Sequence, residues 1–153
     1  SWAEFVSASL PTLFQVTRRP NAREEDDVFA AENACASIAK ILHYNSTKVS
    51  NVQEVVTHWV DTLPVTNDEE AAPYAYSFLA QLIEQQNPAV MSQADKAFVF
   101  IAQALEAETL QGQTATRIVG AAKHLVTAAG LDANQLLATL PPETQHTVRA
   151  FFG

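Results

Sequence analysis

Hydrophobic residues recur at helical spacing along the chain. The clearest series places six apolar side chains on one side of a helix: Val52, Val55, Val56, Trp59, Val60 and Leu63. Similar series run through residues 97–105 and 118–129. Because valine, isoleucine and threonine do not alternate with polar residues as they do in strands, the pattern predicts an all-α protein.

Eight helices are predicted, at residues 2–16, 22–44, 51–63, 67–86, 92–109, 113–129, 132–139 and 142–152. Five predicted starts carry a capping residue three positions before an acid or amide, which is the capping-box arrangement. The pairs are Asn21 and Glu24, Asn51 and Glu54, Thr66 and Glu69, Ser92 and Asp95, and Asp132 and Gln135. Pro73 lies inside the fourth helix, so we expect that helix to bend there or to begin after it.

The spacing of the predicted helices indicates a repeat. Alternate helices begin near residues 21, 66 and 112, so pairs recur every 40 to 46 residues, which is the period of HEAT and armadillo repeats. Such pairs bury their apolar faces by stacking, which predicts one right-handed α-solenoid of antiparallel helix pairs with a terminal cap. The expected repeats are residues 1–44, 51–86 and 92–129, followed by capping helices at 132–152.

Residues 34–37 read Ala-Cys-Ala-Ser, which makes one side of the second helix slim. A slim face admits either a ligand or a neighbouring helix at short axial distance. We favour helix packing and interpret Cys35 as a small core residue. Trp59, in the middle of an apolar series, is likewise expected in the core, with His58 at the surface.

Composition and charge narrow the function classes. The net charge of −8 and the lack of a Lys/Arg patch argue against nucleic-acid binding and favour basic protein partners. The sequence contains no membrane-length apolar run and no HExxH, GxSxG or glycine-rich phosphate motif. Its one cysteine and scattered histidines suggest neither a disulfide nor a metal site. We therefore expect a protein that is not an enzyme and needs no cofactor.

Three segments carry a family resemblance: "ENACASIAKIL", "VQEVVTHWVDTLPVTNDEEA" and "FLAQLIEQQNPAV", with "LPPETQHTVRAFF" at the end. They resemble the C-terminal HEAT repeats of importin-β-type (karyopherin-β) nuclear import receptors, closest to the branch that carries ribosomal proteins and histones. The resemblance covers residues 25–153 and implies that the chain is a C-terminal fragment of a larger protein. It also implies a monomer that shuttles between cytoplasm and nucleus. The full receptor would bind Ran-GTP and nucleoporins through parts absent from this chain.

The resemblance further implies that acidic surfaces hold basic cargo, such as nuclear localisation segments, histones and ribosomal proteins. Two acidic clusters begin equivalent predicted helices and should therefore lie on one edge of the stack. The predicted cargo-binding residues are Glu24, Glu25, Asp26, Asp27, Glu32, Asp68, Glu69 and Glu70. Acids in a first helical turn also complement the helix dipole without any partner. A general α-solenoid adaptor, or a segment that only stabilises the receptor, are the alternatives.

Overall fold

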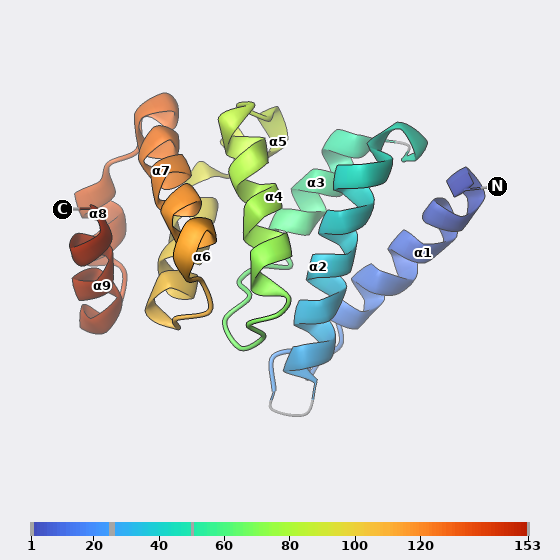
Figure 1. The fold of residues 1–153 in the computed structure, drawn as a ribbon, viewed down its shortest axis with the longest axis horizontal. Coiled ribbons are helices and arrows are strands. Elements are labelled where there is room, and N and C mark those ends of the chain that lie inside the picture. Colours follow the sequence, from blue (N-terminus) through green and yellow to red (C-terminus); the bar gives the residue numbers. More distant parts are fainter. Residues whose placement is uncertain (1, 25–26, 50, 153) are drawn as a thin grey trace.

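Residues 2–24, 27–49 and 51–152 are described by a computed structural model (Figure 1). Within these residues the chain forms helices and no strand, as its hydrophobic pattern predicted. The helices are α1 (Trp2–Thr17), α2 (Val28–Asn45), α3 (Val52–Val60), α4 (Ala72–Glu84), α5 (Pro88–Met91), α6 (Ala94–Glu106), α7 (Gly112–Ala129), α8 (Ala133–Ala138) and α9 (Pro142–Phe152). A 3₁₀ turn, η1 (Ser46–Lys48), follows α2.

The helices stack in a row of two layers. Helix α2 packs against α4, and α4 packs against α7, which makes one layer. The other layer runs from α1 past α3 and α5 to α6 and α9, and α1 also packs closely against α2. The two termini lie at opposite ends of the row (Figure 1). This arrangement is an all-α solenoid, as predicted, whereas the expected division into repeats stays a prediction.

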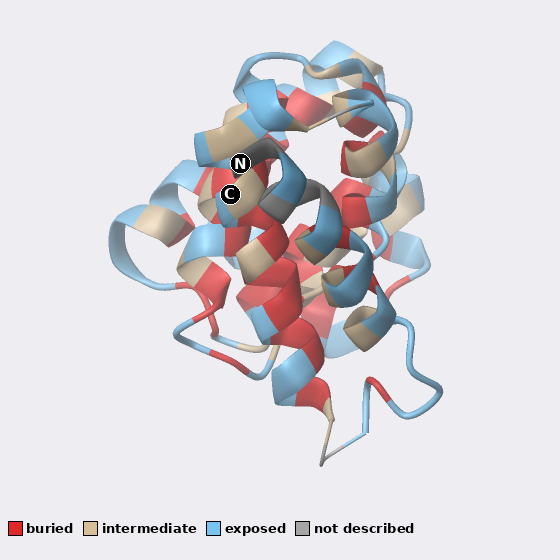
Figure 2. Ribbon diagram, turned by 90° about the vertical axis from the view of Figure 1, so that its right-hand side faces the viewer, coloured by how far each residue is buried: buried red, intermediate tan, exposed pale blue. Residues whose placement is uncertain are grey.

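The apolar faces of the two layers form one continuous core (Figure 2). It extends from Leu10 and Phe14 in α1 to Val148 in α9, and it includes the fully buried Trp59 and Tyr76. Each helix contributes side chains at helical spacing, so each layer is covered by the other. Stacking therefore buries a face that no single helix pair could bury alone.

The slim face of α2 is occupied by a side chain of α3. Cys35 and its neighbours Ala34 and Ala36 are buried, and the indole Nε1–H of Trp59 donates a 3.0 Å hydrogen bond to the Cys35 carbonyl. A larger side chain at this point of α2 would exclude the indole from the helix backbone. The prediction of helix packing at residues 34–37 is confirmed, as is the core position of Trp59.

Two helices begin five or six residues later than their sequences predicted. Helix α2 begins at Val28 instead of residue 22, because residues 18–24 form successive turns. Helix α4 begins at Ala72 instead of residue 67, because the preceding backbone N–H groups bond to carboxylates. Pro73 then lies in the first turn of α4, where its missing N–H group leaves no helical hydrogen bond unmade.

The predicted capping boxes are mostly wrong. Asp132 does cap α8, since its carboxylate accepts from the backbone N–H of Gln135 at 3.1 Å. Asn51 precedes α3 in a left-handed conformation, with φ of 55°, and its side chain makes no cap bond. At residue 92 the prediction missed α5, whose start is capped by the Asn87 side chain, so α6 begins only at Ala94.

Candidate functional site

The described residues of the two predicted acidic clusters lie in segments at the same end of the stack (Figure 1). The turns that precede α2 and the loop that precedes α4 are joined by the side chain of Arg23. Its guanidinium donates to the carbonyls of Thr62 at 2.6 Å, Pro64 at 2.9 Å and Leu63 at 3.2 Å. These carbonyls belong to the loop between α3 and α4, and Arg23 belongs to the turns before α2. The Arg23 guanidinium therefore links the two segments.

Glu32 holds the same loop from inside the protein. The side chain is 0 % exposed. Its Oε1 accepts from the backbone N–H groups of Asn67 at 2.9 Å and Asp68 at 2.7 Å, and its Oε2 accepts from the Thr66 N–H at 3.1 Å. The Asn67 side-chain amide adds a fourth bond at 3.0 Å. The carboxylate is therefore fully occupied within the fold, and the predicted cargo-binding role of Glu32 on an exposed edge is wrong.

Asp68 has a similar internal role. It is 9 % exposed, and its Oδ1 accepts from the backbone N–H groups of Glu70 and Ala71, both at 3.0 Å. Its Oδ2 accepts from the amide of Asn33 at 3.1 Å. Asp68 thus satisfies N–H groups at the start of α4 and ties that start to α2. The prediction that Asp68 belongs to an exposed acidic edge is corrected accordingly.

The apolar side of the loop is fixed by two hydroxyl groups. The Val65 N–H donates to the Tyr76 hydroxyl at 2.9 Å, and the Thr109 hydroxyl donates to the Val65 carbonyl at 3.0 Å. Burial raises the pKa of Tyr76 above its usual range, so the hydroxyl stays protonated. Residues 61–71 are thereby hydrogen-bonded to the side chains of five residues outside the loop: Arg23, Glu32, Asn33, Tyr76 and Thr109.

Only some of the predicted cargo-binding acids lie at the surface of the described residues. Glu24, Glu69 and Glu70 are exposed and Asp27 is half-buried, whereas Glu25 and Asp26 lie outside the described residues. We call Glu24, Asp27, Glu69 and Glu70 the acidic edge. Within the described part of the chain, none of these four carboxylates forms an ion pair.

Cys35 lies in surroundings that suppress thiol chemistry. It is fully buried, and burial raises its pKa to about 12, although hydrogen bonding from the Thr62 hydroxyl at 3.1 Å lowers it somewhat. A nucleophilic cysteine needs a depressed pKa and access to substrate, so Cys35 is suited to packing instead.

Sequence reasoning missed the internal roles of Glu32 and Asp68, and a partial signal was present for Glu32. It lies among Ala31, Ala34 and Cys35, which are the core-facing positions of α2. A carboxylate at such a position must find partners within the protein, because an unpaired buried charge is costly. The identity of those partners, about 35 residues along the chain, follows only from the fold.

Metal-binding clusters and membrane spans are both absent from the described residues. In that portion of the chain, no three residues of the types His, Cys, Asp and Glu are grouped so as to hold a metal ion. None of the helices described there has the length and apolar character needed to cross a membrane.

The stacked helices place the chain in a class of protein, the α-solenoids built from helix pairs. Residues 68–119 match the family described as importin repeat. The whole chain is similar to importin subunit beta-3 of Saccharomyces cerevisiae, with 31 % identity over 156 residues. The chain spans 14 % of that relative's length. The family match and this similarity support the predicted HEAT repeats of the importin-β type.

Proposed function

We propose that the chain is part of a nuclear import receptor and acts there as a non-catalytic scaffold that holds basic cargo at its acidic edge. The importin repeat and the similarity to importin subunit beta-3 support the receptor assignment. The observation that supports cargo binding is that Glu24 and Asp27 precede α2 and Glu69 and Glu70 precede α4, at the same end of this helix pair (Figure 1). These carboxylates come from segments separated in sequence and held together by Arg23 and Asn33.

The physics of such an edge favours weak, salt-sensitive binding. Each exposed ion pair contributes about 0.2–1 kcal/mol, so affinity requires several lysines or arginines meeting several carboxylates. Because residues 61–71 are already hydrogen-bonded to the rest of the fold, binding does not have to order this loop, which lowers the entropic cost of association. Lysine-rich segments of histones and ribosomal proteins have this chemistry. In the proposal, Ran-GTP and nucleoporins contact other parts of the receptor, which shuttles between cytoplasm and nucleus.

The proposal is tested by fluorescence anisotropy with a fluorescein-labelled lysine-rich histone-tail peptide at several salt concentrations. The variant Glu69→Lys/Glu70→Lys is expected to weaken binding about tenfold at low salt, because repulsion replaces attraction. The matched control, Glu54→Lys/Asp95→Lys, makes the same charge change at exposed positions on α3 and α6. We expect it to bind within about twofold of the unchanged chain.

Equal weakening by both double variants would show a general charge effect and no acidic edge. Binding that is indifferent to salt and to both variants would favour a general solenoid adaptor that recognises neutral partners. Failure of the peptide to bind at any salt concentration would leave this segment with a purely structural role in the receptor.

A further inference from the structure

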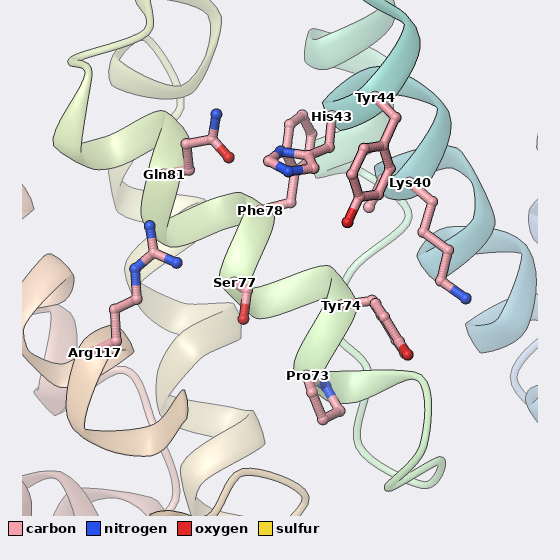
Figure 3. A pocket seen from close by; sticks show the side chains of 10 residues that line it. Lys40, His43, Tyr44, Pro73, Tyr74, Ser77, Phe78, Gln81 and Arg117 are labelled. Carbon is pink, nitrogen blue, oxygen red and sulfur yellow. The ribbon is translucent and has the colours of Figure 1, made fainter. Parts of the chain in front are cut away.

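A groove of about 370 Å³ lies between α2 and α4 and reaches α7 (Figure 3). Its buried lining residues are apolar: Ala39 from α2 and Phe78 from α4. Two tyrosines form exposed walls, Tyr44 from α2 with 75 % of its surface exposed and Tyr74 from α4 with 52 %. Large exposed aromatic side chains around an apolar floor are typical of binding surfaces.

The charge of this groove is opposite to that of the chain. The chain has a net charge of −8, yet none of the described Asp and Glu residues lines the groove, which contains Lys40, His43 and Arg117. Arg117 is neutralised by Glu84, because the two groups form hydrogen bonds of 2.7 and 3.2 Å between helices α7 and α4. Lys40 has no such partner among the described residues.

The ammonium group of Lys40 is nevertheless held in place. Its Nζ lies 3.9 Å from the centre of the Tyr74 ring, so a cation–π contact fixes the charge at the wall of the groove. An exposed lysine would otherwise lose considerable side-chain entropy on forming an ion pair. The ring of Tyr74 thus preorganises a positive charge beside an apolar floor, and both tyrosine hydroxyls supply further donors.

We propose that this groove binds an extended acidic segment of a partner protein, with a glutamate or aspartate carboxylate on Lys40 and a neighbouring apolar side chain on Phe78 and Ala39. The groove's volume suits a few side chains rather than a folded domain. A nucleic acid is a poorer fit, because one unpaired lysine in a chain of charge −8 offers too few phosphate contacts. This inference is independent of the acidic edge, whose proposed partners have the opposite charge.

The inference is tested by anisotropy with a fluorescein-labelled peptide of repeated sequence Gly-Glu-Leu. Otherwise identical Gly-Gln-Leu and Gly-Lys-Leu peptides and an oligouridine serve as comparison probes. We expect the Gly-Glu-Leu peptide to bind about tenfold more tightly than the Gly-Gln-Leu peptide, because only the carboxylate pairs with Lys40. The Gly-Lys-Leu peptide should not compete with it, whatever its affinity for the acidic edge.

Single-residue variants test whether the Gly-Glu-Leu peptide binds in the groove. Lys40→Glu should weaken binding of the Gly-Glu-Leu peptide about tenfold, and Tyr74→Ala should weaken it about threefold by releasing the ammonium group. Lys123→Glu is the matched control. Lys123 is an exposed lysine near Phe152, so this substitution makes the same charge change outside the groove. It should leave affinity within about twofold. Equal effects of Lys40→Glu and Lys123→Glu, equal binding of the three peptides, no binding of the Gly-Glu-Leu peptide, or tighter binding of oligouridine would each overturn the inference.

Discussion

At the scale of single residues, the loop before α4 is held by a side chain that is buried inside the protein. Glu32 is buried in α2 and accepts four hydrogen bonds from residues 66–68. The acidic edge depends on it indirectly, because Glu69 and Glu70 follow that loop. The small apolar neighbours of Glu32 in the sequence indicate a core-facing position, whereas its hydrogen-bond partners follow only from the packing of a distant loop.

Replacing this carboxylate should destabilise the protein. We expect Glu32→Gln to lower the free energy of unfolding by about 2–4 kcal/mol, because an amide offers one acceptor oxygen and turns an NH₂ group toward backbone N–H donors. Urea denaturation measures the change. The control Glu69→Gln, at an exposed position, should stay within about 0.5 kcal/mol of the unchanged chain. A Glu32→Gln effect as small as that of the control would show that the buried hydrogen bonds do not stabilise the loop.

At the scale of helices, the sequence predicted both ends of α9 and came within one residue for α1 and α7, whereas it placed the starts of α2 and α4 too early. The apolar series of residues 52–63 identified α3 and the core position of Trp59, because helical periodicity is a local property of the sequence. The segments before α2 and α4 are held by Arg23 and Glu32, whose partners are far along the chain. A capping pattern such as that at Thr66 cannot show that a buried carboxylate has already taken the same N–H groups.

The packing of α3 on α2 should fail when the slim face is filled. We expect Cys35→Leu to lower the free energy of unfolding by about 1–3 kcal/mol, because the larger side chain displaces the Trp59 indole from the α2 backbone. Ala30→Leu enlarges an exposed residue of the same helix and should have little effect. Thermal unfolding followed by circular dichroism measures both. Equal stability of the two variants would contradict the close approach of these helices.

At the scale of the whole molecule, the repeat period predicted the architecture. Helix pairs recurring every 40 to 46 residues require lateral stacking, and the structure has α2, α4 and α7 side by side. The period could not predict which acids face outward, because exposure depends on how each loop folds back on its neighbour. The groove beside Lys40 escaped prediction for the same reason, since its walls come from α2 and α4.

The most direct test of the stacked architecture is the distance between its two ends. Spin labels at Ala8→Cys in α1 and Arg149→Cys in α9, both exposed positions, are measured by double electron–electron resonance in a Cys35→Ala background. These helices lie at opposite ends of the row (Figure 1) and are separated by several lateral steps of about 10 Å, so we expect a distance of about 30 Å or more. A distance of about 10–15 Å, at which helices of a closed bundle face each other, would contradict the stack.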